Sequence, residues 1–385
     1  DEAVFRQAID ESFSPNAVLL DLEPTVIDAV TSGRNRTLWE PCQKVCGKED
    51  AANNFARGRY GVGAALMGEA AEAISGAVEE LDNLQGFLAF HSYGGGTGSG
   101  FESALVATLR AQYPKAEIVD VAIFPSEHFN TSPLEAYNSV FAAHSTMEAG
   151  LCTILADNES LFATCTEQLK LDAPSYPQLN ALLSQAVASL TVGLRFDGPQ
   201  KIDLRDLRMN LVPFPRIHFC LIGQAPLGGS KARRNFTRDI TRRCVKSMNI
   251  RGKYIAACLL YRGDNSPCAA SDTVADLKSR RVLEFVDWSP AGVKFGFDTH
   301  RPTLVPRGVI PGLGSEPRSV TAVANATDAR IAWGRVKHEF DLMFSKRAFV
   351  HWFLTEGMEE SEFLEAAKDL EHLEKEYEEL EAVKM

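Results

Sequence analysis

Seven residues at 94–100, Gly-Gly-Gly-Thr-Gly-Ser-Gly, restrict the fold of this 385-residue chain more than any other stretch. An apolar run at 87–90 precedes them and an amphipathic segment begins at Phe101, which predicts a strand, a turn and a helix. Glycines let the backbone approach a ligand closely, and free N–H groups at a helix start favour an anion such as phosphate. The hydroxyls of Thr97 and Ser99 would add to this cradle. A flexible linker is the alternative, but linkers are not usually held between a buried strand and an amphipathic helix.

The turn differs from two common nucleotide-binding motifs. No lysine follows it, so it is not a Walker A loop. The dinucleotide motif requires an acidic residue about 20 positions later, at the end of the next strand. Asp120 is at about that distance, but it lies inside the apolar run 118–124. The sequence therefore indicates a phosphate-binding turn of another class.

Composition narrows the class of protein without identifying it. The length predicts two or three domains, and a hydrophobic content of 45% is ordinary for a globular protein. No apolar run approaches the roughly 20 residues of a membrane span, and no signal peptide is recognised. Of eight cysteines only Cys42 and Cys46 are close, so we expect buried free thiols in a reducing cytosol rather than a zinc site. A net charge of −11 argues against nucleic acid and favours partners with basic surfaces.

Polar residues follow several predicted strands. Apolar runs at 17–24, 87–90, 118–125 and 152–156 alternate with helical patterns, which predicts a parallel α/β domain. The carboxyl ends of such strands face the ligand crevice. Polar side chains at these ends are Asp21, Glu23, Ser92, Thr131, Asp157 and Asn158. A carboxylate beside phosphate needs a cation between them, so Glu23 is a candidate Mg²⁺ contact through water; the alternative is a solvated strand end.

A helix start follows Gly47. Asp50 is predicted to cap the helix that begins there, ahead of a further helix near 61–84. Asn53 and Asn54 could hydrogen-bond phosphate or hydroxyl groups. Taken alone, this segment indicates no more than a helix start.

A long apolar helix is predicted at 176–195, hydrophobic on most sides as expected of a helix buried between two domains. Tyr176 and Asn180 lie one turn apart at its start. A purine needs an aromatic face for stacking and an amide for its edge, so the pair is a candidate base contact. The alternative is a core tyrosine and a helix-start asparagine.

A second set of strand-like runs, separated from the first, begins after Gly198. Strand-like runs predict a second α/β unit, with strands at 214–222, 253–261, 282–288, 293–297 and 319–324. A basic run at 230–251 includes one aromatic residue, Phe236, so we interpret it as solvated or partner-facing rather than as a nucleic-acid site. Helices at 328–346 and from Met358 predict a hairpin that lies on the protein with an acidic outer face.

Segments along nearly the whole chain resemble the tubulin family, the α class in particular. FtsZ proteins share the glycine turn but not the carboxyl-terminal helices. Thr25-Val-Ile after Glu-Pro, and Val350-His-Trp with Glu359-Glu360, resemble α rather than β tubulins. The matching segments are 21–28, 47–54, 94–101, 210–219, 258–264, 285–288, 346–352 and 356–360.

The resemblance implies an α/β fold with a parallel-sheet GTP-binding domain at 1–175, a core helix at 176–198, a second α/β domain at 199–327 and a carboxyl-terminal helical hairpin at 328–385. It implies a cytoplasmic, cytoskeletal protein that pairs with a β-type tubulin and polymerises head to tail into microtubules. Microtubule-binding proteins and motors would dock on the acidic carboxyl-terminal helices. GTP and Mg²⁺ are the implied cofactors, and in the α class this GTP is buried at the dimer interface and not hydrolysed.

Carried over by position, the resemblance assigns a nucleotide role to residues along the first half of the chain. Glu23 would serve Mg²⁺, and the guanine would meet Tyr176 and Asn180. The remaining contacts to the phosphates, the ribose and the base would come from ten residues: Asp50, Asn53, Ser92, Gly95, Gly96, Thr97, Gly98, Thr131, Glu135 and Asn158.

The catalytic contribution implied by the resemblance lies elsewhere. The α subunit of the family offers a loop carboxylate to the GTP of the next β subunit, and the matching segment here is 201–208. Asp206 stands where the family has glutamate, and Asp203 matches a second acidic position. Asp is one methylene shorter, and a displacement near 1 Å can cost on the order of 10²-fold in a positioned reaction. We therefore expect Asp206 to support hydrolysis weakly or from a shifted loop.

Three departures from the family keep other functions open. The residues before Ala17 are too few for the first strand and first nucleotide loop, which predicts weak GTP binding. The segment 219–252 is short and basic where the family makes lateral contacts, and no Glu-rich tail follows Met385. A non-hydrolysing lattice or capping tubulin is the first alternative. A free-standing nucleotide enzyme is the second, although it would lack a Walker lysine and a base of its own.

Overall fold

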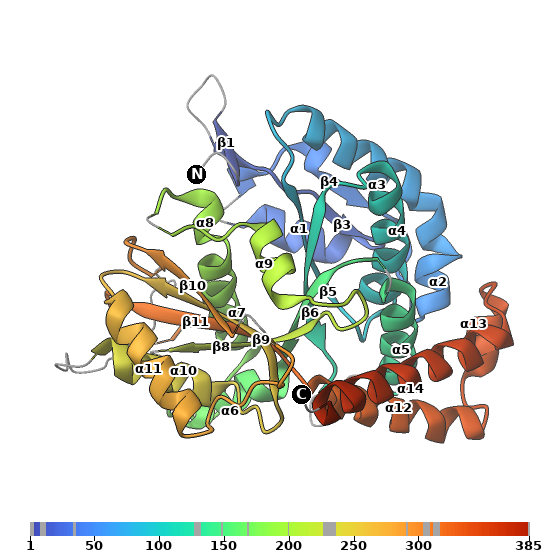
Figure 1. Ribbon diagram of the computed structural model, residues 1–385. Helices are drawn as coiled ribbons and strands as arrows, with labels where there is room; N and C mark the ends of the chain where they lie inside the picture. Colours follow the sequence, from blue (N-terminus) through green and yellow to red (C-terminus); the bar gives the residue numbers. More distant parts are fainter. Residues whose placement is uncertain are drawn as a thin grey trace. The chain divides into compact units, whose positions relative to one another are not determined.

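The structure is a computed structural model that describes residues 4–7, 13–33, 36–126, 132–147, 149–167, 169–198, 200–225, 236–289, 292–302, 309–310 and 316–383. The chain divides into two compact units. The first unit comprises Asp1–Pro125, Asn130–Leu151 and Trp333–Leu373. The second comprises Ser126–Phe129, Cys152–Ala332 and Glu374–Met385. Each unit is built from separated stretches of chain, which the colours of Figure 1 allow the reader to follow.

The first unit contains short paired strands, a parallel strand pair and a set of helices. Strands β1 (Phe5–Gln7) and β2 (Phe13–Pro15) pair antiparallel, and β3 (Leu19–Asp21) pairs parallel with β4 (Lys44–Cys46). The longer strands β5 (Gly86–Ser92) and β6 (Glu117–Phe124) are parallel, with His91 opposite Ala122. The helices wholly in this unit are α1 (Pro24–Ser32), α2 (Phe55–Arg59), α3 (Val62–Glu79), α4 (Glu102–Gln112), α5 (Glu135–Thr146) and α13 (Val350–Thr355). Most of α12 (Ala329–Ser345) and of α14 (Glu360–Ala382) also belongs to it, whereas the start of α12 and the end of α14 belong to the second unit.

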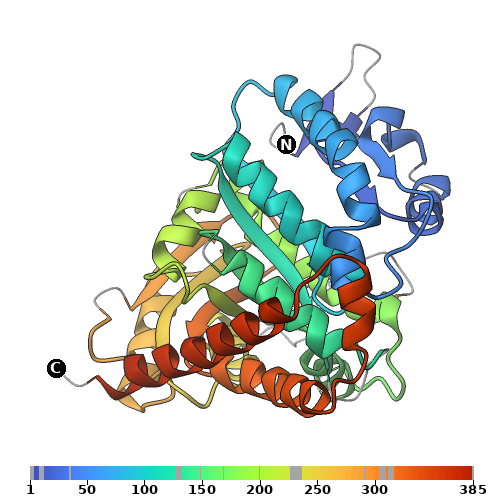
Figure 2. The same ribbon diagram turned by 90° about the vertical axis from the view of Figure 1, so that its right-hand side faces the viewer.

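Aromatic side chains join α5 to the carboxyl-terminal helices within this unit. The ring centroids of Tyr137 lie 5.0 Å from Phe340, 5.5 Å from Phe353 and 5.5 Å from Phe363, all near edge-to-face. Phe141 lies 4.8 Å from Phe363 in the same arrangement. Edge-to-face pairs are the preferred geometry for buried rings. Figure 2 shows the orange and red helices α12 and α14 alongside the green α5.

Among its described residues, the second unit contains five strands in the order β10-β9-β11-β8-β7. They are β7 (Cys152–Asp157), β8 (Phe219–Ala225), β9 (Tyr254–Arg262), β10 (Val293–Asp298) and β11 (Ser319–Ala326). Strand β11 runs antiparallel to β8 and β9, whereas β7–β8 and β9–β10 are parallel pairs. The helices are α6 (Asn158–Glu167), α7 (Tyr176–Leu190), α8 (Val192–Arg195), α9 (Leu204–Leu211), α10 (Phe236–Ser247) and α11 (Pro267–Ser279).

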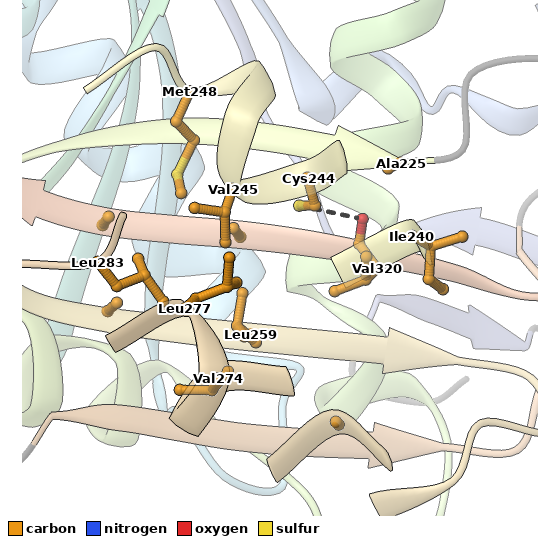
Figure 3. Close-up of a cluster of buried hydrophobic side chains, with 14 of the residues drawn as sticks. Ala225, Ile240, Cys244, Val245, Met248, Leu259, Val274, Leu277, Leu283 and Val320 are labelled. Carbon is orange, nitrogen blue, oxygen red and sulfur yellow. Dashed lines mark hydrogen bonds between the residues drawn. The ribbon is translucent and has the colours of Figure 1, made fainter. Parts of the chain in front are cut away.

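Helices α10 and α11 pack their apolar faces on these strands (Figure 3). Ile240 and Val245 of α10 and Val274 of α11 meet alternate residues of β9 and β11, as the period of two in a strand requires. The outer faces of the two helices are joined by ion pairs, Arg238–Asp272 at 3.3 Å and Arg242–Asp276 at 2.8 Å. This part of the basic run is therefore neutralised by its neighbour, and residues 226–235 lie outside the described residues.

Most predicted elements are present, and the errors have local causes. The stripe of Phe363, Leu370 and Leu373 on α14 is fully buried, so the helix lies on the protein as predicted. The strand expected at 214–222 begins only at Phe219, because Pro215 and Pro213 cannot donate ladder hydrogen bonds.

Three other boundaries differ from the predictions. The run at 282–288 forms a single bridge, Phe285 with Tyr254, instead of a strand. The helix expected over 176–195 is divided at Thr191, and the helix expected to reach residue 84 ends at Glu79. The fold class is confirmed: strands, mostly parallel, alternate with helices.

Candidate functional site

The glycine turn connects β5 to α4 in the first unit. The Ser92 hydroxyl accepts the N–H of Gly94 at 3.3 Å, and a π-helical turn at Thr97–Phe101 then leads into α4. Ser99 is fully buried and its hydroxyl donates to the Gly95 carbonyl. The prediction that Ser99 contributes a hydroxyl to a ligand cradle is therefore wrong, because this side chain closes the turn on itself.

Four of the five glycines in the turn are held by their surroundings. An added Cβ would lie 2.9 Å from Glu135 Cγ at Gly94, 2.6 Å from the Asn54 nitrogen at Gly96, and 2.5 Å from the Ser92 carbonyl oxygen at Gly98. At Gly100 it would lie 2.1 Å from the Phe55 carbonyl oxygen. At Gly95 it would meet nothing within 4 Å. The turn is thus fixed by tight packing and open at Gly95, which is the arrangement a backbone needs to receive a ligand.

Asn138, which sequence reasoning missed, ties the turn to its neighbours. This fully buried side chain of α5 donates through Nδ2 to the carbonyls of Gly94 and Asn53, both at 2.8 Å. Its Oδ1 accepts the N–H of Phe55 at 3.0 Å. An amide inside the mostly apolar stretch from Ala136 to Ala143 was the signal that could have found it, since buried amides are nearly always hydrogen-bonded.

The cap of α2 is Asn54 rather than Asp50. Asn54 Oδ1 accepts the N–H groups of Ala56 at 2.8 Å and Arg57 at 3.4 Å. Asp50 is exposed, and its carbonyl accepts Arg57 Nε at 3.0 Å. Asn53 is also exposed and adopts φ of +52°, a left-handed conformation that asparagine tolerates. The prediction that Asp50 caps this helix was wrong because the chain makes a further turn before the helix begins.

Acidic residues lie beside the turn, as the strand-end pattern predicts. The Asp21 carboxylate accepts the N–H of Leu22 at 2.7 Å and is hydrogen-bonded to the Thr97 hydroxyl. Burial raises the pKa of Asp21 above its ordinary value, against the lowering effect of these hydrogen bonds. Glu23 is partly exposed at the N-terminus of α1. A carboxylate in contact with Thr97 is a suitable oxygen ligand for a hard cation.

Glu135 is the first residue of α5 and is buried next to Gly94. Its backbone N–H donates to the Ser132 carbonyl at 3.2 Å. Of the residues predicted at this loop, Thr131 lies outside the described residues.

The remaining predicted nucleotide contacts lie in the second unit. Asn158 opens α6, whose first N–H groups at Glu159 and Ser160 are accepted by the Asp157 carboxylate at 3.0 and 3.3 Å. Tyr176 opens α7 and is 57% exposed, and Asn180 is exposed one turn later. The exposure of Tyr176 rules out the alternative of a core tyrosine. It leaves an aromatic face available to a ligand.

Asp206 lies in the first turn of α9. Asp203 caps this helix by accepting the Asp206 N–H at 2.7 Å. Asp206 itself is partly exposed, and its carbonyl accepts Asn210 Nδ2 at 2.6 Å. An acidic side chain in the first turn is favoured by the helix dipole. Over the described residues, no helix is long and apolar enough to cross a membrane.

Comparisons with known proteins identify the family. Residues 1–166 match the GTPase domain of the Tubulin/FtsZ family, and residues 215–338 match the tubulin C-terminal domain. The chain is 44% identical over 378 residues to the tubulin alpha-2 chain of Caenorhabditis elegans, covering 96% of this chain and 84% of that protein. It is 45% identical over 376 residues to the tubulin alpha chain-like 3 protein of Homo sapiens, covering 95% and 84%. The chain therefore belongs to the tubulin family as an α-tubulin-like member, a GTP-binding subunit of the cytoskeleton.

Proposed function

We propose that this chain is the α-type subunit of a heterodimer with a β-type tubulin, and that the two polymerise head to tail into microtubules. In this proposal the chain binds GTP with its phosphates against the turn Gly94–Gly98. The observation that carries the assignment is the open space at Gly95 in a turn whose other glycines are tightly packed. Backbone N–H groups at the start of the following helical segment attract anions, so phosphate fits this space.

The acidic residues next to the turn fit a bound Mg²⁺. Asp21 contacts Thr97, and Glu23 follows on the same edge. When bound, Mg²⁺ supplies positive charge that offsets the repulsion between these carboxylates and the phosphates. Glu23 is proposed as the water-mediated contact. Asp21 is positioned to hold the Thr97 hydroxyl in a fixed orientation.

The other nucleotide contacts are proposed from the resemblance, with support from exposure. Asn53, Tyr176 and Asn180 present exposed side chains, as ligand contacts require. Asn158 is proposed for the ribose or base, and Glu135 for the ribose edge beside Gly94. Asp50 is retained as a weaker candidate, since it is exposed but does not cap α2.

Substitution of Gly95 tests the nucleotide assignment. Gly95→Ala should lower the affinity for GTP at least about tenfold, which corresponds to about 1.4 kcal/mol. The variant should therefore retain less GTP after gel filtration, and the unfolding temperature of the nucleotide-free protein should not change. Gly68→Ala is the matched control, because a Cβ at Gly68 in α3 also meets nothing within 4 Å. Gly96→Ala should lower both GTP content and stability. If Gly95→Ala retains as much GTP as Gly68→Ala, phosphate does not bind at this turn.

Asp206 is proposed to act on the GTP of the next subunit rather than on GTP bound to its own chain. Its side chain is partly exposed in the first turn of α9, where a carboxylate could orient a water molecule. Co-polymers of a β-type tubulin with Asp206→Glu should hydrolyse GTP faster than those with the unaltered chain, and Asp206→Asn should slow them. Unchanged turnover in both variants would instead support a non-hydrolysing lattice or capping subunit.

The acidic surface of α14 is proposed as a docking site for microtubule-binding proteins and motors. Glu365, Glu371 and Glu379 lie on exposed positions of this helix. Basic surfaces would be attracted to them in a salt-dependent manner.

A further inference from the structure

Three buried side chains that the nucleotide assignment does not use meet behind the glycine turn. His91 is on β5, Asp120 is on β6, and Glu102 is the first residue of α4. One ligand atom from each lies within 4.8 Å of the others, and His91 Nε2 is 2.9 Å from Asp120 Oδ1. The side chains of His91 and Asp120 are 6% and 1% exposed, and Glu102 is 7% exposed. The cluster is therefore shielded from solvent on all three elements.

The strand register explains why the first two residues meet. His91 is opposite Ala122, and Asp120 lies two residues before Ala122 on the same face of β6. Side chains of diagonal neighbours on one face are within reach of each other. Glu102 then reaches the pair from the end of the turn, because the π-helical segment returns the chain to β5.

The two carboxylates of this cluster offer oxygen ligands to a cation. Neither oxygen of the Glu102 carboxylate has a hydrogen-bond partner among the described residues, although both are buried. A second carboxylate, Asp120, lies within the same small space. Burying an ionised carboxylate without compensation is very costly. With the His91 imidazole neutral and both carboxylates ionised, the cluster would carry a charge of −2, which one divalent cation would balance.

The histidine is oriented as a metal ligand. His91 Nδ1 is hydrogen-bonded to the Gly98 carbonyl, which can only accept, so Nδ1 carries the proton. In a neutral ring this leaves the Nε2 lone pair directed at Asp120. Histidines that bind metals usually donate their other N–H to a backbone carbonyl or carboxylate in this way.

We propose that His91, Asp120 and Glu102 together bind one zinc ion. An imidazole nitrogen favours Zn²⁺ over Mg²⁺ or Ca²⁺, which prefer oxygen ligands only. Ligands in a tetrahedral site at about 2.0–2.2 Å from zinc are separated by roughly 3.3–3.6 Å. The His91–Asp120 pair would open slightly and the flexible Glu102 side chain would close the remaining gap. Water would occupy the fourth position, and the ion would join β5, β6 and α4 around the turn.

Cobalt provides a spectroscopic test on the full chain. After treatment with EDTA and gel filtration, Co²⁺ titrated in the presence of excess Mg²⁺ and GTP should give the visible spectrum of a four-coordinate site at one equivalent, and Zn²⁺ should abolish it. Glu102→Gln, which keeps the size of the side chain, should weaken Co²⁺ binding about 100-fold. Glu69→Gln, an exposed residue of α3, should bind as the unaltered chain does. Glu23→Gln should also leave the spectrum unchanged, because it affects only the nucleotide-associated cation.

A measurement on the unaltered chain covers the case in which Glu102→Gln does not fold. X-ray absorption of the zinc-loaded protein should show nitrogen and oxygen ligands at about 2.0–2.2 Å. Sulfur at about 2.3 Å would place the zinc on cysteines and overturn the proposal. The absence of saturable Co²⁺ binding would also overturn it and would indicate that Glu102 is simply protonated. A folded Glu102→Gln variant that bound Co²⁺ as tightly as the unaltered chain would also overturn the proposal.

Discussion

The buried amide of Asn138 offers the strongest test of how the site is supported. Asn138→Ala removes the partner of three backbone groups, the carbonyls of Gly94 and Asn53 and the N–H of Phe55. At about 1–3 kcal/mol for each buried group left unpaired, the loss would be about 3–9 kcal/mol. A water molecule entering the vacated volume would form hydrogen bonds to some of these backbone groups and reduce the loss. We therefore expect a decrease of about 3–4 kcal/mol in the free energy of unfolding, near the lower bound.

This loss can be measured by thermal unfolding of the full chain with and without GTP. For a unit of about 200 residues, 3–4 kcal/mol corresponds to a decrease in unfolding temperature of roughly 6–16 °C. Asn83→Ala is the matched control, because Asn83 is exposed, and it should change the unfolding temperature by no more than about 2 °C. Asn138→Ala should also lower GTP affinity, since Gly94 and Asn53 lose their common anchor. A decrease below 1 °C with unaltered GTP affinity would refute the argument.

Three further predictions concern the packing and titration of other regions. Phe363→Ala should lower the free energy of unfolding by about 3–5 kcal/mol in denaturant titrations, because its ring lies among five aromatic neighbours. Hydrogen bonds from Arg242, the largest cause, and from Arg280 lower the pKa of Asp276 below its ordinary value, and the charges of both guanidinium groups add to the effect. Ionised Asp276 therefore stabilises the folded protein above pH 3.8, and this stabilisation is lost as the pH falls through the lowered pKa. Carboxyl NMR of Arg242→Gln should show the pKa of Asp276 rising toward 3.8. A thiol reagent at pH 8 should label three cysteines rapidly and leave five protected until the protein unfolds; mass spectrometry should find the rapid sites at Cys42, Cys46 and Cys268.

The sequence was sufficient to predict elements whose signals are local. The glycine turn between β5 and α4 was identified because glycine spacing and flanking apolar periodicity are properties of a short window. The apolar stripe of α14 was identified for the same reason. Family resemblance added the identity of the nucleotide. The boundaries of β8 were missed, although Pro213 and Pro215 contained the information.

Features that depend on contacts between distant segments could not be predicted. Asn138 acts on Asn53 and Gly94, which are 85 and 44 residues away in the sequence. The meeting of His91 with Asp120 depends on the register of two strands, and a one-residue slip would place the two side chains on opposite faces. Asp120 was noted only as an acidic residue inside an apolar strand. That His91 is the partner of Asp120 follows only from the pairing of β5 with β6.

Tyr137 and Asn138 are consecutive residues of α5, and they face different structures. Tyr137 packs among the rings of the carboxyl-terminal helices, and its hydroxyl donates to the Ala348 carbonyl at 3.0 Å. Asn138 joins the backbone of the glycine turn at Gly94 to the segment before α2 at Asn53. A displacement of the outer helices would thus be transmitted through this one turn of α5 to the glycine turn, where we propose that the nucleotide binds. Mutations that disturb the outer layer near Phe363 should consequently produce nucleotide defects, and such defects would not by themselves show that a residue touches GTP.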